Sequence, residues 1–195
     1  MDWTAVWSLT REKFRYLPTA FCYFSHPENK TLVSCSNGNA SGNILEEAIL
    51  QGFFELVERD SVAIWWYNRL QMPEVDLASF NDPFIHEMQR YYRRHDREIW
   101  VLDLSSDLNI PAFAALTRKS SGGQEAIMMG FGAHFDARLA LIRALTELNQ
   151  MMLFVLELEN GKWGEESIID NATLEWPKQA TVANQPYLLP HSGKS

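Results

Sequence analysis

The sequence predicts an α+β fold in which two long helices cover one side of a mostly antiparallel sheet. Two long runs, 44–70 and 136–156, carry apolar residues spaced by three and four, as on one face of a helix. Short apolar runs between them are separated by turn residues such as Ser120-Ser121-Gly122-Gly123, which is typical of strands joined by hairpins. The strand-like runs are 98–104, 111–118 and 125–131. The 195 residues are enough for the core of a single domain over 1–195.

The first part of the chain predicts little regular structure. Residues 1–17 mix isolated aromatics with polar residues, so we expect a loosely structured lead-in. Residues 18–24 and 31–36 have the composition of two strands, which we expect to pair as a hairpin across a turn at His26-Pro27. Small polar residues and two glycines at 36–43 predict a tight turn before the first long helix.

Helix start signals divide the rest of the chain. Asp82, followed by Pro83, is typical of an N-cap with proline in the first turn, and predicts a helix to about His95. Asp136 is the predicted N-cap of the second long helix. Gly, Pro, Asn and Lys are scattered without periodicity from Glu159 onward, so we expect an irregular tail over 159–195.

The two long helices read as copies of one unit. A shift of 92 positions places Gly38 on Gly130, and equally places Glu55 on Glu147 and Glu58 on Gln150. We therefore predict a duplicated strand–glycine turn–helix unit, with copies at about 31–70 and 123–156. The alternative is a chance alignment of two amphipathic helices.

One polar stripe on the first long helix points to chemistry. Glu47, Gln51, Glu55 and Glu58 are spaced by four, four and three, so they share one helix face. Carboxylates on one stripe repel one another unless a cation neutralises them. Mg²⁺ carried with phosphates is one such cation, and a glycine turn that enters a helix offers backbone N–H groups to phosphate. The alternative is an ordinary surface helix in which Arg59 pairs with Glu55.

The motifs around this stripe resemble the YcaO-domain family. They occur in order over residues 34–150 and include Ser36-Asn37-Gly38, Gly42-Asn43, Glu47-Ala48, Glu55-Leu56-Val57-Glu58-Arg59-Asp60, Trp65-Trp66-Tyr67-Asn68-Arg69-Leu70, Leu102-Asp103-Leu104, Gly130-Phe131-Gly132-Ala133-His134 and Arg143-Ala144-Leu145-Thr146-Glu147-Leu148-Asn149-Gln150. Complete domains of the family are about twice as long and have an earlier glutamate-bearing helix and a later strand-rich part. The chain therefore resembles the central part of such a domain.

The resemblance implies a site for ATP and Mg²⁺ built without a Walker motif, and this sequence contains none. It implies Glu47, Glu55 and Glu58 as metal ligands, and a phosphate contact from Arg143. The nucleotide contacts that it implies are Asn43, Glu55, Glu58, Arg59, Arg143, Glu147 and Gln150. No residue is singled out as a catalytic acid or base.

The same resemblance implies the reaction. ATP phosphorylates the amide oxygen of a peptide bond, and a neighbouring Cys, Ser or Thr side chain of a ribosomal precursor peptide closes an azoline ring; some relatives make thioamides or amidines. The implied partners are that peptide and an E1-like, leader-binding protein. The alternative is a catalytically incomplete module that binds a peptide or a partner protein.

Charge and composition exclude other classes. A net charge of −8 and a pI of about 5.1 argue against a nucleic-acid surface. No apolar run reaches ~18 residues, which argues against a membrane span, and no signal peptide is visible, so we expect a cytoplasmic location. Seven Trp and eleven Phe imply exposed apolar surface, so we expect a homo-oligomer.

Overall fold

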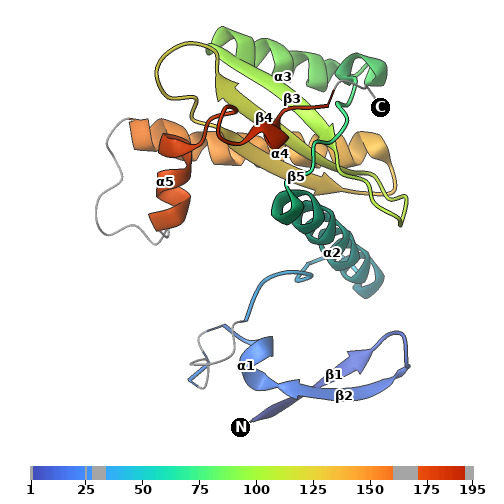
Figure 1. The fold of residues 1–195 in the computed structure, drawn as a ribbon. Helices are drawn as coiled ribbons and strands as arrows, with labels where there is room; N and C mark the ends of the chain where they lie inside the picture. The colour runs from blue at the N-terminus through green and yellow to red at the C-terminus, as the bar shows by residue number, and fades with distance from the viewer. Residues whose placement is uncertain (1, 25, 28–33, 160–170, 192–195) are drawn as a thin grey trace. The chain divides into compact units, whose positions relative to one another are not determined.

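The computed structural model describes residues 2–24, 26–27, 34–159 and 171–191. The chain divides into two compact units, 1–39 and 40–195. Figure 1 shows the first unit as β1, β2 and α1, and the second as the remaining helices and strands. None of the helices in the described ranges combines the length and the apolar character that a membrane crossing needs.

The first unit is a β-hairpin. Strands β1 (Trp3–Ser8) and β2 (Lys13–Pro18) pair antiparallel, and the lead-in expected over 1–17 is therefore wrong. The hairpin forms because Trp7 and Phe14 lie opposite each other and pack edge to face at 5.2 Å, a pairing that stabilises neighbouring strands.

The strand expected over 18–24 is also wrong, because α1 (Thr19–Cys22) forms there. The backbone N–H of Thr19 donates to the carbonyl of Asp2, which turns the chain back at the end of the hairpin. Residues 34–36 are not in a strand, and 31–33 of that prediction lie outside the described residues. Gly38 forms the expected turn with a φ of 82°.

The second unit contains a three-stranded antiparallel sheet. Its order is β3 (Arg97–Asp103), β4 (Ala112–Lys119) and β5 (Met128–Ala133), which confirms the predicted class of fold. Strand β5 begins three residues later than expected. The delay arises at Ala126, which has a φ of 43°, outside the extended region that a strand needs.

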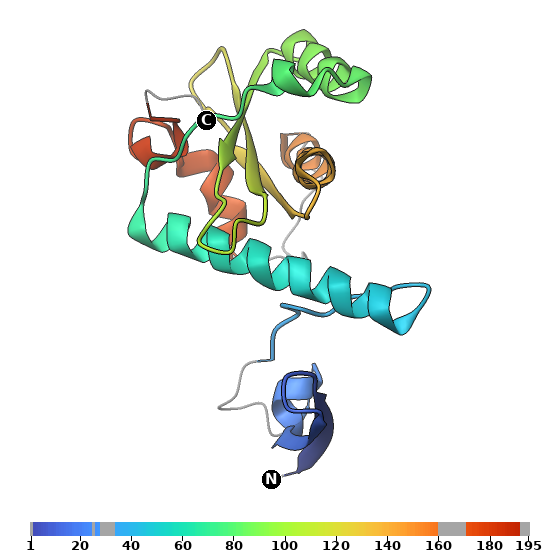
Figure 2. The same cartoon turned by 90° about the vertical axis from the view of Figure 1, so that its right-hand side faces the viewer.

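The two long helices lie against different faces of this sheet, so the prediction that both cover one side is wrong. On one face Phe113 and Ala115 pack with α3 (Pro83–Arg94) and α4 (Ala137–Glu159), and on the other Ala114 and Leu116 pack with α2 (Leu45–Asn68). Figure 2 views the sheet nearly edge-on, with α3 and α4 on one side and the C-terminal segment on the other. Strand β4 needs cover on both faces because its first six residues are all buried.

Two glycines in β5 bring α4 close to the sheet. A Cβ on Gly130 would lie 2.1 Å from the backbone nitrogen of Leu148, and one on Gly132 would lie 2.3 Å from the carbonyl oxygen of Ala140. The sequence predicted a glycine turn here, but both glycines belong to the strand, and the turn follows at 134–136. Asp136 caps α4 as predicted, its carboxylate accepting from the backbone N–H of Arg138 at 2.8 Å.

Helix α2 ends at Arg69, which is in the left-handed conformation. The side chains that face the sheet are Phe54, Val57, Ser61 and Trp65. Most of the apolar residues expected on the buried face are instead exposed: Leu45, Ile49, Phe53, Leu56, Ile64 and Tyr67. We call these six residues the exposed stripe. Both sets are spaced by three and four, so periodicity alone does not choose between them.

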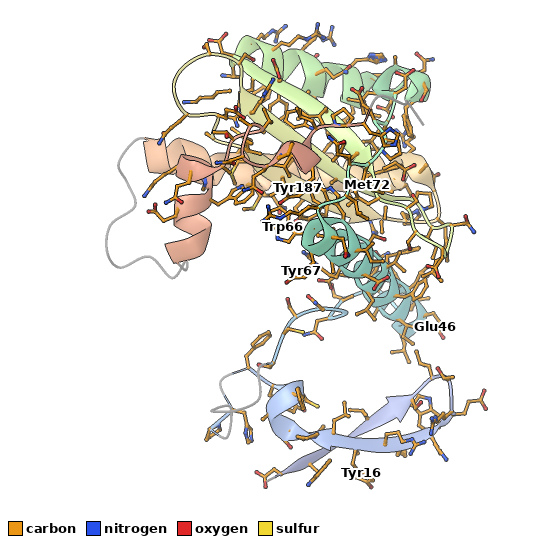
Figure 3. All side chains as sticks on the ribbon, in the orientation of Figure 1. Tyr16, Glu46, Trp66, Tyr67, Met72 and Tyr187 are labelled. Atoms are coloured by element: carbon orange, nitrogen blue, oxygen red, sulfur yellow. The ribbon has the colours of Figure 1, made fainter. Side chains whose placement is uncertain are left out.

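The C-terminal tail is ordered where it packs on the sheet, so the irregular tail expected over 159–195 is wrong in its described part. Helix α5 (Asn171–Gln179) and the 3₁₀-helix η2 (Pro186–Leu188) form there, and η1 (Leu77–Phe80) precedes α3. The carbonyls of Tyr187 and Leu188 accept from the indole N–H groups of Trp65 and Trp100, at 3.4 and 2.8 Å. Figure 3 labels Tyr187 beside Trp66, and the two rings lie 5.7 Å apart.

Candidate functional site

Helices α2 and α4 meet through one arginine. Arg143 on α4 donates hydrogen bonds to the side-chain oxygen of Gln51 on α2 and, at 3.3 Å, to the carbonyl of Ala133 at the end of β5. Its guanidinium also lies 5.7 Å from the centre of the Phe54 ring. These contacts fix a cation at the edge of the sheet, between the two helices.

Carboxylates gather beside this arginine. Glu58 is 12% exposed and lies 3.4 Å from Arg59, whose Nε lies 3.7 Å from Glu55. Glu147, from α4, is close enough to Glu58 to affect its ionisation. We call Glu55, Glu58, Arg59 and Glu147 the carboxylate cluster. Three of its residues come from α2 and one comes from α4, and both helices pack on the sheet.

Two of the three glutamates of the cluster, Glu58 and Glu147, have raised pKa values. Burial, followed by the negative charges of Glu147 and Glu55, raises the pKa of Glu58 to about 7, against the opposing effect of Arg59 and Arg143. Burial likewise raises the pKa of Glu147, although a hydrogen bond from the backbone of Phe131 opposes the shift. Burial disfavours the charged form of a carboxylate, a cation bound beside it would favour that form, and such groups gather at functional sites.

The donor set fits Mg²⁺ bound together with a phosphate. Mg²⁺ is usually held by one or two carboxylates, with phosphate and water oxygens completing the coordination. In the described ranges no three acidic, His or Cys side chains are grouped closely enough to form an all-protein metal site. Arg59 Nε is buried and has no hydrogen-bond acceptor among the described residues. The cluster therefore suits a metal that brings its own phosphate oxygens.

Three of the predicted site residues, Asn43, Glu47 and Gln150, lie outside the carboxylate cluster. Glu47 accepts from the backbone N–H and side-chain amide of Asn43, at 2.7 and 3.0 Å, and so holds the start of α2. Neither residue is among the groups that affect the ionisation of Glu58 or Glu147. Gln150 is exposed on α4, and none of the described contacts joins it to the cluster. The structure thus brings together Glu55, Glu58, Arg59, Arg143 and Glu147.

Two contacts of Arg143 were not predicted as site features. Gln51 belongs to the polar stripe, but only its position 92 residues before Arg143 signals their pairing. Phe54 is almost completely buried and packs against both Arg143 and the ring of His134, whose centre lies 4.6 Å away. His134 Nδ1 accepts from the backbone N–H of Asp136 at 3.0 Å, so this histidine helps to form the turn before α4.

A pocket of about 360 Å³ adjoins the cluster. Its walls come from α2, β5, α4 and α5, and they include Trp66, Met129, Phe131, Glu147, Met151 and Trp176. Glu147 therefore borders both the carboxylate cluster and this pocket. Every other residue in its wall is apolar or aromatic.

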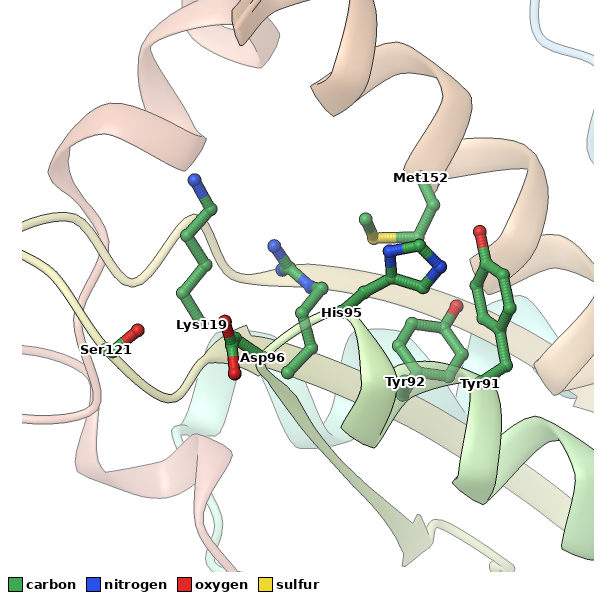
Figure 4. A pocket seen from close by; sticks show the side chains of 8 residues that line it. Tyr91, Tyr92, His95, Asp96, Lys119, Ser121 and Met152 are labelled. Carbon is green, nitrogen blue, oxygen red and sulfur yellow. The ribbon is translucent and has the colours of Figure 1, made fainter.

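A second pocket, of about 380 Å³, lies at the end of α3 (Figure 4). Its wall includes Tyr92, His95, Lys119 and Met152. The buried Arg97 in this pocket donates to the Thr117 hydroxyl and to the Ala126 carbonyl, so it is engaged in holding β3, β4 and the approach to β5 together. Figure 4 shows none of the cluster residues among the side chains of this pocket.

The chain is similar to known proteins over nearly its whole length. A family model described as YcaO cyclodehydratase, ATP- and Mg²⁺-binding, matches residues 1–195. A heterocyclase solved in complex with substrate and cofactor is 50% identical, with a TM-score of 0.85 over 99% of this chain and 25% of that one. YcaO from Methanopyrus kandleri, bound with AMPPCP and Mg²⁺, is 26% identical, with a TM-score of 0.73 over 99% of this chain and 49% of that one.

An uncharacterized protein of Methanothermobacter thermautotrophicus is 31% identical over 155 residues, which are 77% of this chain and 40% of that protein. The chain thus spans between a quarter and about a half of the length of these relatives. The family match covers every residue of the chain and includes both helices that carry the cluster. The chain therefore belongs to the YcaO family.

Proposed function

We propose that the protein is the ATP- and Mg²⁺-dependent part of a cyclodehydratase that acts on a ribosomal precursor peptide. The observation that carries the proposal is the carboxylate cluster with Arg143 beside it. Its partly buried glutamates have raised pKa values, and its arginines are placed to contact phosphate. Solved relatives hold AMPPCP with Mg²⁺ in one case and substrate with cofactor in another, which supports the same chemistry here.

Each cluster residue has a distinct task in this proposal. Glu55 and Glu58, one helical turn apart, would hold Mg²⁺, which supplies charge neutralisation to the phosphates when bound. Arg59 and Arg143 would contact phosphate oxygens, and Glu147 would complete the anionic wall. Phosphoryl transfer depends mainly on such positioning and charge stabilisation, so a dedicated catalytic base is not required of these residues.

The reaction balances without a further reagent. The amide oxygen of the peptide attacks the terminal phosphorus of ATP, and ADP leaves. The sulfur or oxygen of the adjacent Cys, Ser or Thr then bonds to the activated carbon and loses its proton. The former amide oxygen leaves as phosphate, and the amide nitrogen loses its proton to form the C=N bond of the azoline. The peptide has then lost one water, and ATP has become ADP and phosphate.

Asn43, Glu47 and Gln150 are assigned to the margin of this site. Asn43 and Glu47 hold the start of α2. Glu47 lies about two turns before Glu55, and this spacing of about 12 Å along the helix suits the length of a triphosphate. Gln150 follows Glu147 by one turn on α4 and is free to approach a bound nucleotide. We further propose that an E1-like, leader-binding protein delivers the precursor peptide, as membership of the family implies.

The test is phosphate release by the complete enzyme with its peptide. Glu58→Gln keeps the shape of the side chain and removes one charge, so turnover should fall on the order of 10–100-fold, as it does when residues that support metal sites are lost. Arg143→Ala should lower turnover as well. Asp60→Asn is the matched control, because Asp60 is exposed on the same helix. Unchanged turnover in both site variants would sink the assignment of this face.

A second function is favoured by one observation. The pocket beside the cluster is lined by apolar and aromatic residues apart from Glu147, which suits a module that binds a peptide or a partner without turning over ATP. Calorimetric titration of the chain with AMPPCP, with and without Mg²⁺, separates the two functions. Binding that depends on Mg²⁺ supports the enzyme, and peptide binding without nucleotide binding supports the module.

A further inference from the structure

The apolar pocket beside the cluster is built around two tryptophans. The rings of Trp66 on α2 and Trp176 on α5 lie 5.0 Å apart, and Tyr187 packs against Trp66 from the tail, as Figure 3 shows for the labelled pair. We call this space, about 360 Å³ in volume, the tryptophan pocket. Its size is within the range of pockets that bury a small ligand or a large side chain.

The chemistry of its walls excludes a phosphate. Glu147 is the single charged residue of the lining, which contains no Arg or Lys, so the walls supply no cation to pair with a phosphate. The remaining walls are aromatic rings, methionines and a proline, which favour an uncharged apolar group. Methionine side chains are flexible and polarisable, so Met129 and Met151 can adapt to occupants of different shapes.

One polar atom of the wall lacks a partner. The indole N–H of Trp176 is buried and has no hydrogen-bond acceptor among the described residues. A buried donor left in this state is destabilising, and an acceptor oxygen from a ligand would remove that cost. The apolar walls and the unpaired N–H of Trp176 together fit a ligand that carries an apolar group and a carbonyl. A peptide residue carries both.

We propose that the tryptophan pocket binds the apolar side chain of the residue next to the one modified in the precursor peptide, and that a peptide carbonyl accepts from Trp176 Nε1. This inference rests on the proposed function, because the reacting amide must lie at the terminal phosphate held by the cluster. Successive residues of an extended peptide are ~3.5 Å apart. The residue next to the modified one therefore lies within reach of a pocket that adjoins the cluster. The tryptophan pocket adjoins it, because Glu147 belongs to both.

The adenine base of ATP fits the same walls less well. Recognition of the base edge requires a donor and an acceptor placed side by side, whereas the pocket offers the Trp176 N–H and only the carboxylate of Glu147 as an acceptor. Glu147 already belongs to the carboxylate cluster. The experiment below distinguishes the two occupants, because a base in the pocket would change the KM for ATP and not that for the peptide.

The experiment uses the complete enzyme with ATP and two precursor peptides that differ only beside the reactive residue, with Leu in one and Gly in the other. Met129→Trp fills the pocket from β5. It should raise the KM for the Leu peptide about tenfold or more, a difference typical of one apolar group in a pocket, and change that for the Gly peptide little. Leu108→Trp, on an exposed loop, is the control and should leave both values unchanged.

Two further variants keep the test decisive. Met129→Ala enlarges the pocket and should shift the preference toward Phe beside the reactive residue, even if Met129→Trp fails to fold. Trp176→Phe keeps an aromatic ring in the wall, although a smaller one, and removes the N–H donor, so the KM for all peptides should rise about five- to tenfold, as for the loss of one hydrogen bond.

Equal effects of Met129→Trp on the Leu and Gly peptides would overturn the inference. A rise in the KM for ATP instead of peptide would do so too, and would assign the pocket to the base. If the proposed function itself is wrong, the result is different: Glu58→Gln keeps the turnover of the wild type. A large loss in Glu58→Gln without any change of peptide preference in the Met129 variants rejects the pocket alone.

Discussion

Arg143 on α4 donates a hydrogen bond to Gln51 on α2, and the two residues are 92 positions apart. The same separation relates Glu55 to Glu147, and the negative charge of Glu55 contributes to the raised pKa of Glu147. Residues at equivalent positions of the two helices therefore face one another. The duplicated unit, with copies at about 31–70 and 123–156, stays a prediction.

The Gln51–Arg143 contact should couple the two helices energetically. Gln51→Ala and Arg143→Ala should each lower the free energy of unfolding. The double variant should lose about 1 kcal/mol less than the sum of the two losses, because each single variant breaks the same hydrogen bond. Urea denaturation of the four proteins measures this difference. Gln51→Ala with Thr146→Ala is the control pair, since none of the described contacts joins those residues, and their effects should add. Strict additivity in the first pair would contradict the contact.

The stability of the nucleotide-free protein should fall as pH rises from about 4.5 to 7. Glu58 has a pKa of about 7 in the folded chain against 4.5 as its ordinary value. Between those values the folded state holds one more proton than the unfolded state, so the free energy of unfolding decreases with pH, and above pH 7 the loss is complete. The loss is on the order of 3 kcal/mol.

Glu58→Gln should remove this part of the pH dependence and leave the protein more stable at pH 8. Urea denaturation at pH 5 and pH 8 is the measurement, with Asp60→Asn as the exposed control. If Glu58→Gln retained the full difference between the two pH values, burial of this carboxyl group would not be its cause.

Gly130 should not tolerate a side chain. The Cβ of an alanine would lie 2.1 Å from Leu148 N and 2.5 Å from the carbonyl oxygen of Ala144, both backbone atoms of α4. Gly130→Ala should therefore lower the free energy of unfolding by about 1–3 kcal/mol or more, as the helix is pushed off the sheet. Gly123→Ala is the control, since its Cβ would meet nothing within 4 Å, and stability there should hold or rise slightly. Equal stability of the two variants would exclude the close packing of α4.

The chain by itself should self-associate. The exposed stripe of α2 includes Leu45, Leu56 and Tyr67, which are 71%, 51% and 82% exposed. Apolar residues gathered on one helix face favour association. Light scattering should show a mass above that of the monomer, reduced by Leu56→Glu and unaffected by Leu108→Glu, a change at an exposed loop leucine elsewhere. A monodisperse monomer at high concentration is the contrary result.

The sequence by itself determined the features that depend on neighbouring residues. Helix α2 follows from a run without proline, and the starts of α3 and α4 follow from Asp82 and Asp136, because a cap bonds to backbone groups two or three residues away. Glu55, Glu58 and Arg59 share a helix face for the same local reason, so their grouping was predictable. The hairpin at 3–18 was missed because its strands are short and its aromatic pairing crosses between them.

Tertiary structure decided what depends on distant partners. Phe54, Val57 and Trp65 are buried in place of the exposed stripe because Tyr187, more than a hundred residues away, and the far face of β4 pack on them. Glu147 joins Glu58 because Gly130 and Gly132 admit α4 to the sheet at close range. Local spacing cannot encode such contacts, since the free energy of burial belongs to surfaces that meet only after the chain has folded.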